Sequence, residues 1–193
     1  MSGFKIDHKQ YKKDDLKVEF SAETLKKIES ITGRYPAENR KSALLPLLHI
    51  AQEEFGGYLS VEAMDYVAKI LGIQYIEVYE VATFYSQFYL EKTGKYVIEV
   101  CRTGPCAICG GEKISEYLQK KLKISDGGTT SDGLFTLREV ECLGACGYAP
   151  AMQINTEFYE HLTEEKTDTI IDLLTKNANT DKPEESRWTE KFF

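Results

Sequence analysis

The chain has 193 residues, of which 42% are hydrophobic and 28% charged, and its net charge at pH 7 is -7. This length is enough for one ordinary hydrophobic core or two small ones, so disulfide bonds are not needed to stabilise it. The acidic balance disfavours nucleic acid or an anionic membrane as a partner, and the best apolar run, at residues 43–51, is too short to span a bilayer. The N-terminal residues show no apolar signal segment, so we expect a reducing compartment, where clustered cysteines typically bind metals or act as redox thiols.

Residues 21–92 have apolar side chains at helical spacing, which predicts a helical subdomain. The first helix is expected to begin after Ser21, a favourable N-cap residue, and to stop at Gly33. Ser42 is the predicted cap of the second helix. This start places Pro46 in the first turn, where its missing N–H costs least.

Two further helices are expected in this half of the chain. One lies between the N-cap Ser60 and the stop at Gly72, and helical spacing resumes from residue 76. The aromatic residues that follow are expected to fill the core, the alternative being that part of them docks a partner; they are Phe84, Tyr85 and Phe88. His49, inside the apolar second helix, is expected to be a packed residue and not a ligand.

The hydrophobic period changes near residue 92, after which β-rich segments alternate with amphipathic helices. The predicted strands are residues 96–100, 135–142 and 151–155, and the predicted helices are residues 112–124 and 163–176. This order indicates a small α/β sandwich that is compatible with a thioredoxin-like layout. The expected fold class is therefore α+β, with an N-terminal helical subdomain followed by a thioredoxin-like α/β domain.

All five cysteines lie in two loops that follow predicted strands. The first loop carries Cys101, Cys106 and Cys109, and the second carries Cys142 and Cys146. Both loops are rich in small residues, which let backbone N–H groups approach a thiolate or sulfide. Two loops at the same end of neighbouring strands are therefore expected to bring the sulfurs together around an anionic group.

Three chemistries compete for these cysteines. A structural zinc site would use Cys106 and Cys109 with the second loop, which leaves Cys101 unused. A thioredoxin-like dithiol oxidoreductase would use Cys106 and Cys109 alone, which leaves the second loop unexplained. A [2Fe–2S] cluster would take either the plant-type set, all three cysteines of the first loop with Cys142 or Cys146, or two from each loop. The two-loop set, Cys101 and Cys106 with Cys142 and Cys146, is the more economical, because the plant-type set would leave Cys142 or Cys146 idle. A strand that runs straight into Cys101 and a helix that begins just after Cys109 also leave no long loop of the plant type.

Four segments resemble the thioredoxin-like [2Fe–2S] ferredoxin subunit of NADH:quinone oxidoreductase, respiratory complex I, and the resemblance covers roughly residues 21–176. They are SALLPLLHIAQEEFGGYLS, VYEVATFYSQF, VCRTGPCAICGGEKISEYL and VECLGACGYAPAMQIN. The resemblance implies that the cluster ligands are Cys101, Cys106, Cys142 and Cys146, and that Cys109 is not a ligand. It is also compatible with a cis peptide bond before Pro150.

The resemblance implies an electron-transfer subunit with no complete active site in this chain alone. Its [2Fe–2S] cluster would exchange single electrons with the FMN of a neighbouring flavoprotein subunit that binds NADH. That places the chain in the cytoplasmic peripheral arm of a membrane-bound complex, or on the matrix side in a mitochondrion, beside other peripheral-arm subunits. The alternative is the equivalent small subunit of an NAD-linked hydrogenase or formate dehydrogenase. A zinc-stabilised interaction module and a dithiol oxidoreductase are the alternatives of another class.

The expected domain organisation has four parts. They are an N-terminal extension (1–20), a helical subdomain (21–92), a thioredoxin-like [2Fe–2S] ferredoxin domain (93–176) and a C-terminal tail (177–193). The chain has neither a GxGxxG motif nor a P-loop, so we expect it to bind no nucleotide by itself.

Overall fold

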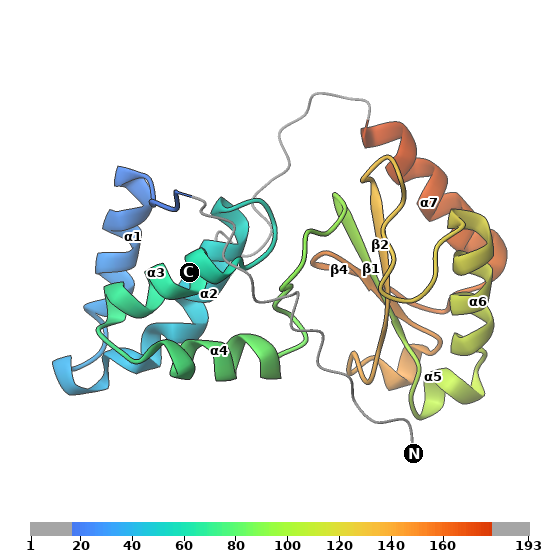
Figure 1. Ribbon diagram of the computed structural model, residues 1–193. Helices are drawn as coiled ribbons and strands as arrows, with labels where there is room; N and C mark the ends of the chain where they lie inside the picture. Colours follow the sequence, from blue (N-terminus) through green and yellow to red (C-terminus); the bar gives the residue numbers. More distant parts are fainter. Residues whose placement is uncertain (1–16, 179–193) are drawn as a thin grey trace, which may run out of the picture. The chain divides into compact units, whose positions relative to one another are not determined.

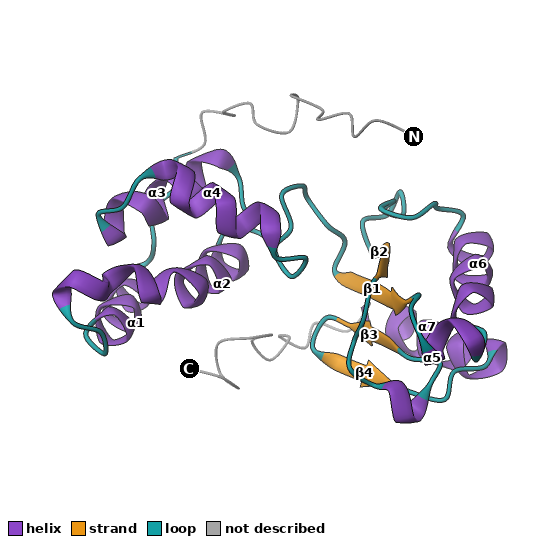
Figure 2. Cartoon of the chain, turned by 90° about the horizontal axis from the view of Figure 1, so that it is seen from below, coloured by secondary structure: helices purple, strands orange, loops and turns teal. Residues whose placement is uncertain are grey.

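The computed structural model describes residues 17–178. These residues divide into two compact units between Lys92 and Thr93. In its described part the first unit consists of helices, whereas the second combines helices with a β-sheet (Figure 1 and Figure 2). Within residues 17–178, no helix is both long and apolar enough to cross a membrane. Most of the predicted N-terminal extension and C-terminal tail lies outside the described residues.

The described part of the first unit follows the predicted order of helices. They are α1 (Ala22–Thr32), the 3₁₀ segment η2 (Ala37–Ala43), α2 (Leu44–Glu54), α3 (Val61–Leu71) and α4 (Tyr75–Phe84). The predicted cap of α1 is confirmed, because the Ser21 hydroxyl accepts the N–H of Thr24 at 3.1 Å. The predicted cap of α3 is confirmed in the same way by Ser60, which accepts the N–H of Ala63 at 3.2 Å. Each bond satisfies a backbone donor that the first helical turn leaves unpaired.

The prediction that Ser42 caps α2 is wrong. The chain enters this helix through the 3₁₀ segment, and the N-cap position falls at Ala43, which has no capping side chain. The turns of the 3₁₀ segment supply the local backbone order that a cap would otherwise supply. Pro46 nevertheless lies in the first turn of α2, as predicted.

The aromatic prediction for the end of α4 is correct only for Phe88, which is buried. Phe84 is 79% exposed and Tyr85 is 41% exposed, so these two residues do not fill the core. The reason is helical geometry. Val78 and Ala82, four residues apart, form the buried face of α4, and Phe84 lies two residues beyond Ala82 on a different side of the helix.

The core of the helical unit is built mainly from aliphatic residues, and its fully buried members include Ile31, Leu47, Leu48, Met64 and Val78. His49 is 8% exposed and packs against Phe88 with ring centroids 4.9 Å apart, which confirms the prediction of a packed residue. Phe20 is also buried and stacks on Phe55 with centroids 4.8 Å apart. The packed region therefore includes a residue from the predicted extension at residues 1–20.

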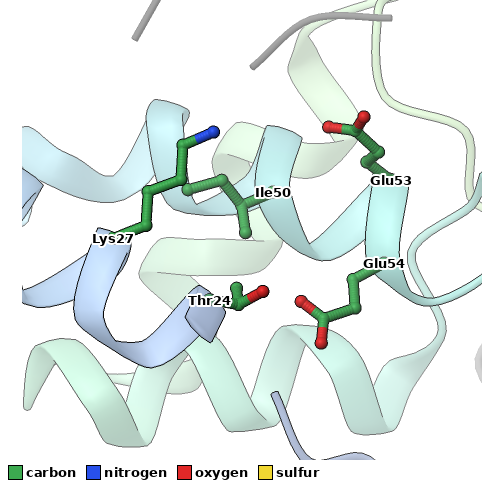
Figure 3. A pocket seen from close by; sticks show the side chains of 5 residues that line it. All are labelled: Thr24, Lys27, Ile50, Glu53 and Glu54. Carbon is green, nitrogen blue, oxygen red and sulfur yellow. The ribbon is translucent and has the colours of Figure 1, made fainter. Parts of the chain in front are cut away.

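A pocket of about 240 Å³ opens between α1 and α2 of the helical unit (Figure 3). It is lined by Thr24, Lys27, Ile50, Glu53 and Glu54. The carboxylate of Glu54 has a local structural role, since it accepts the backbone N–H of Ser21 at 2.7 Å. All five cysteines belong to the second unit, so this pocket is not part of the cysteine site.

The second unit contains a mixed sheet with the strand order β2-β1-β3-β4. Its strands are β1 (Tyr96–Cys101), β2 (Phe135–Val140), β3 (Met152–Ile154) and β4 (Glu157–Tyr159). The β1–β2 pair is parallel, whereas the β1–β3 and β3–β4 pairs are antiparallel. The interior position of β1 explains why every one of its residues is buried. The predicted α+β class is confirmed.

Two helices, α6 (Gly111–Leu122) and α7 (Glu164–Ala178), pack on one face of this sheet (Figure 1). The parallel connection from β1 to β2 passes through α6, as parallel pairing requires a long crossover. α6 and α7 bury four aliphatic side chains against the sheet: Ile114, Leu118, Ile170 and Ile171. The opposed sheet residues include Ile98, Val100 and Leu137. This packing fixes the C-terminal ends of β1 and β2, where the two cysteine loops begin.

Candidate functional site

The first cysteine loop, residues 101–110, begins at the last residue of the interior strand β1. Cys101 ends this strand and is 3% exposed. The chain then forms a one-turn helix, α5 (Pro105–Ile108), in which Cys106 is 2% exposed. Gly104, just before α5, has a φ of 52°, a positive value that favours glycine. Within the predicted loop, a glycine turn followed by proline starts a short helix at Cys106.

Gly111, the first residue of α6, brings this helix close to both buried cysteines. A Cβ at this position would lie 2.7 Å from the carbonyl oxygen of Cys101 and 2.9 Å from that of Cys106. Contacts under 3.0 Å are essentially never made by a real Cβ, so glycine alone fits here without a shift of the backbone. Any side chain at residue 111 would push against the strand end and the short helix that hold these two sulfurs.

The second cysteine loop, residues 141–151, connects β2 with β3. The expectation that Cys142 ends a strand is wrong, because β2 ends at Val140, which pairs with the last residue of β1. Cys146 begins a short 3₁₀ turn, η3 (Cys146–Tyr148). Both cysteines of this loop are exposed, and the N–H of Gly144 donates to the Cys142 sulfur at 3.4 Å. An N–H directed at sulfur stabilises a thiolate.

Hydrogen bonds join the two loops next to Cys101. The N–H of Cys101 donates to the carbonyl of Ala151 at 3.2 Å. The Thr103 hydroxyl donates to the carbonyl of Glu141 at the start of the second loop. The Cys101 thiol also lies 3.4 Å from the carbonyl oxygen of Glu141. The first loop is thus tied to both ends of the second.

A small apolar cluster lies where the two loops meet. It consists of the buried residues Cys101, Cys106 and Ala151, on which the partly buried Leu143, Ala145 and Ala149 pack. The peptide bond between Ala149 and Pro150 is cis, which confirms the expectation for this loop. The two cysteines of this cluster are buried, whereas Cys109, Cys142 and Cys146 are exposed and form the open side of the site.

The two buried thiols have pKa values shifted in opposite directions. Burial raises the pKa of the Cys106 thiol, and the charges of Cys101 and Cys146 raise it further. Burial also acts to raise the pKa of Cys101. However, the backbone of Thr103 and Leu143 and the Cys106 side chain stabilise the Cys101 thiolate more strongly, so its pKa lies below the usual range. Cys106 therefore interacts electrostatically with sulfurs of both loops.

Cys109 differs from the other cysteines of the first loop. It is exposed at the C-terminal end of α5, where its N–H donates to the carbonyl of Pro105 at 2.9 Å. A dithiol enzyme attacks through an accessible thiol of low pKa. The partner of Cys109 in the C-x-x-C motif, Cys106, is buried and has a raised pKa, so Cys106 does not meet this requirement. The structure therefore does not favour Cys106 as the attacking thiol of a dithiol oxidoreductase.

The sulfur donors of the two loops fit a [2Fe–2S] cluster. All five thiols are free, and thiolates are the ligands that such clusters use. Such a cluster distributes its four ligands over two irons. Two of the three cysteines of the first loop and both cysteines of the second loop match this requirement.

Sequence reasoning missed three features of this site. The Gly-Pro step at residues 104–105 is a recognisable signal for the start of α5. The contacts of Gly111 and the bond from Thr103 to Glu141 have no comparable signal, because both depend on how the two loops pack.

Comparison with known families and proteins extends this picture. Residues 28–175 match the family model of the thioredoxin-like [2Fe–2S] ferredoxins. A protein of Rickettsia felis that is named as a subunit of NADH-quinone oxidoreductase is 50% identical over 153 residues, which are 79% of this chain and 92% of that protein. The mitochondrial NADH dehydrogenase (ubiquinone) flavoprotein 2 of Dictyostelium discoideum is 46% identical over 162 residues, which are 84% of this chain and 66% of that protein.

A solved structure shares the fold. The NAD+-reducing [NiFe]-hydrogenase in its air-oxidized state superposes with a TM-score of 0.62 at 22% sequence identity, over 78% of this chain. The aligned region is 25% of the hydrogenase chain, so this chain spans about a quarter of that protein's length. Since the family model matches most of its length and a relative is 50% identical, the chain belongs to the thioredoxin-like [2Fe–2S] ferredoxin family, and its cofactor is a [2Fe–2S] cluster.

Proposed function

We propose that this chain is a subunit of NADH:quinone oxidoreductase whose [2Fe–2S] cluster exchanges single electrons with the FMN of a neighbouring NADH-binding flavoprotein subunit. The carrying observation is that two adjoining loops at one end of the sheet carry five free cysteines, three on the first loop and two on the second. Relatives at 46–50% identity, named after NADH-quinone oxidoreductase or as an NADH dehydrogenase flavoprotein, support the assignment. The chain then lies in the peripheral arm of the complex, on the cytoplasmic side or, in a mitochondrion, in the matrix.

The proposed ligands are Cys101, Cys106, Cys142 and Cys146, with Cys109 outside the set. A bound [2Fe–2S] cluster supplies one-electron redox chemistry. The residues of this chain give its site two different sides, because the first pair of cysteines is buried and the second pair is exposed. An electron can enter or leave only where a partner comes close, so the exposed second loop is the proposed side of exchange.

Exposed apolar residues border this open side. Ile108, beside Cys109 at the end of α5, is 88% exposed, and Tyr148, in the turn that Cys146 begins, is 54% exposed. When a partner removes large exposed apolar side chains from water, their burial lowers the free energy of the complex and favours binding. We therefore place the contact with the flavoprotein subunit over Ile108 and Tyr148.

The second candidate function is the equivalent subunit of an NAD-reducing hydrogenase. The solved hydrogenase with a TM-score of 0.62 is the observation that favours it. At 22% identity that similarity concerns the fold, whereas the relatives at 46–50% identity are named after NADH-quinone oxidoreductase or NADH dehydrogenase. NADH:quinone oxidoreductase is therefore the first candidate.

Electron exchange with the flavoprotein subunit tests the proposal. The cluster-loaded chain, reduced with dithionite and freed of excess reductant, is mixed with the oxidised flavoprotein subunit of the same organism. We expect the EPR signal of the reduced cluster to disappear while the absorbance of oxidised FMN falls. Co-purification of this chain with hydrogenase subunits, and no exchange with the flavoprotein, would support the second candidate instead.

A pair of variants tests the docking face in the same assay. Ile108→Glu places a charge in the proposed contact, so we expect full cluster content but slow electron exchange. Leu173→Glu is the matched control, because Leu173 is 57% exposed on α7, away from both cysteine loops in sequence and on a separate element. Equal exchange rates in the two variants would contradict docking over Ile108.

A further inference from the structure

An ion pair joins the first cysteine loop to β2. Arg102 directly follows Cys101, and its Nη1 lies 3.2 Å from Oε2 of Glu139. The N–H of Arg102 also donates to the carbonyl of Val140 at 3.0 Å, so its backbone and its side chain are both held by β2. The Arg102 side chain is 57% exposed and that of Glu139 is 22% exposed. The cationic end of Arg102 therefore has a defined anchor in a site that is open to water.

The carboxylate of Glu139 is held from its other side by α6. The Ser115 hydroxyl donates to Oε1 of Glu139 at 2.7 Å, and Ser115 is only 2% exposed. The Gln119 amide donates to the Ser115 hydroxyl at 3.3 Å and lies 3.5 Å from the same carboxylate oxygen. One oxygen of Glu139 is thus fixed by a buried hydroxyl and the other by the guanidinium. Such a carboxylate has little freedom to move.

The other charges of these strands lie on the opposite face of the sheet. Arg138 pairs with Glu99 at 3.5 Å. Successive residues of a strand point to opposite faces, so the Arg138 pair is separated by the sheet from the Glu139 pair. The carboxylate of Asp126 is engaged by the backbone, since the N–H of Glu139 donates to it at 2.8 Å. Arg102 is thus the cation that Glu139 holds on the α6 face, one residue along the chain from the proposed ligand Cys101, whose side chain by the same alternation points to the opposite face at the strand end.

We propose that Glu139 is a positioning residue that holds the charge of Arg102 beside the first cysteine loop, and that this charge raises the reduction potential of the cluster. The inference rests on the proposed ligand set. One-electron reduction by dithionite would add one negative charge to the cluster that these thiolates hold, and a fixed cation nearby would stabilise the reduced state more than the oxidised one. A cation that moved freely in solvent would contribute much less, because water and salt would screen it. The buried hydroxyl of Ser115 is the anchor of this arrangement.

The test is an EPR-monitored redox titration of the full-length, cluster-loaded protein. Arg102→Gln is expected to make the potential more negative, so that at the wild-type midpoint the ratio of reduced to oxidised centres falls about threefold, which is about 28 mV for a one-electron couple. Arg102→Lys keeps the charge and should keep most of the potential. When Arg102→Gln is introduced into the Glu139→Gln variant, the potential should shift clearly less than when it is introduced into the wild type. The reason is that Arg102 is no longer held once Glu139 has been replaced.

Two further variants separate positioning from simple charge. Ser115→Ala changes no charge but removes the anchor of Glu139, so we expect a shift in the same direction as for Arg102→Gln and of smaller size. Lys121→Gln is the control, since Lys121 lies near the other end of α6 and pairs with Asp168 on α7. Its potential should equal that of the wild type. Far-UV circular dichroism checks that each variant is folded.

Each failure has a distinct meaning. A wild-type protein without iron, sulfide or an EPR signal would overturn the proposed function, and the inference with it. A normal signal whose midpoint does not move in Arg102→Gln, or moves equally in Lys121→Gln, would overturn the role of Arg102 alone. If Arg102→Gln shifted the potential equally in the wild type and in the Glu139→Gln background, the positioning role of Glu139 would be overturned. If Arg102→Gln failed to load the cluster, an unchanged potential in Ser115→Ala would still overturn the positioning role of Glu139.

Discussion

Replacement of Gly111 by alanine is expected to damage the fold and the cysteine site together. The added Cβ would lie 2.7 Å from the carbonyl oxygen of Cys101 and 2.9 Å from that of Cys106. The nearest contact must open by about 0.7 Å to reach the ordinary limit of 3.4 Å. Both displaced atoms are backbone, so no flexible side chain can give way.

The expected cost of Gly111→Ala combines two opposing effects. Overpacking of this kind typically costs about 1–3 kcal/mol. Alanine gains roughly 0.5–1 kcal/mol over glycine inside a helix, which offsets part of that cost. We therefore expect a net loss of about 1–2 kcal/mol in the free energy of unfolding of the reduced, cluster-free chain. Because the shift occurs at two proposed ligands, the variant should also retain less iron and sulfide than the wild type.

Urea unfolding of the cluster-free chain and iron and sulfide analysis of the loaded chain measure the two effects. Gly147→Ala is the matched control: it lies directly after Cys146 in the second loop, and a Cβ there would meet nothing within 4 Å. This control should match the wild type in stability and in cluster content. Wild-type behaviour of Gly111→Ala, or equal damage in Gly147→Ala, would refute the argument from close packing.

Three further changes are expected to have measurable effects. Burial lowers the pKa of His49 to about 4, so the unfolded chain binds the proton first as the pH falls below 6.5. The contribution of neutral His49 to stability is therefore fully present above pH 6.5, and the free energy of unfolding decreases by about 3 kcal/mol toward pH 4. His49→Leu should flatten that part of a urea-midpoint profile against pH, and an unchanged slope would contradict the assignment. Thr103→Val removes the hydroxyl that donates to the Glu141 carbonyl, so stability should fall by about 1 kcal/mol in urea unfolding, and iron loss to a chelator should be faster. Lys121→Met removes the contacts to Asp168 at 2.5 Å and Asp172 at 3.1 Å, and should lower the thermal midpoint only slightly, since half-exposed pairs contribute about 0.5 kcal/mol.

Local signals explain which elements could be predicted. Ser21 and Ser60 cap their helices through bonds to residues only three positions away, so a short window of sequence contains the whole interaction. Ser42 has the same residue type but a different outcome, because the 3₁₀ segment before α2 occupies its place. The helical spacing of α4 was visible, yet which aromatic residues at and after its end are buried depends on how α4 packs on α3.

Contacts between distant residues explain what could not be predicted. The order β2-β1-β3-β4 places β3 beside β1, and the pairing of Val100 with Met152 joins residues far apart in the chain. The end of β2 is set by the end of its partner β1, which is why Cys142 falls outside the strand. For the site, spacing grouped the cysteines into two loops. The burial of Cys101 and Cys106 follows instead from Ala151 packing on them, which spacing does not encode.

The central claim, that two cysteines from each loop hold the cluster, is tested most directly by five single Cys→Ser variants of the full-length chain. Each is loaded anaerobically with iron and sulfide, analysed for both, and examined by EPR after reduction with dithionite. We predict wild-type cluster content and signal for Cys109→Ser, and loss or strong change of the signal for serine at the proposed ligands Cys101, Cys106, Cys142 and Cys146. Loss of the cluster in Cys109→Ser with retention in Cys142→Ser or Cys146→Ser would contradict the account.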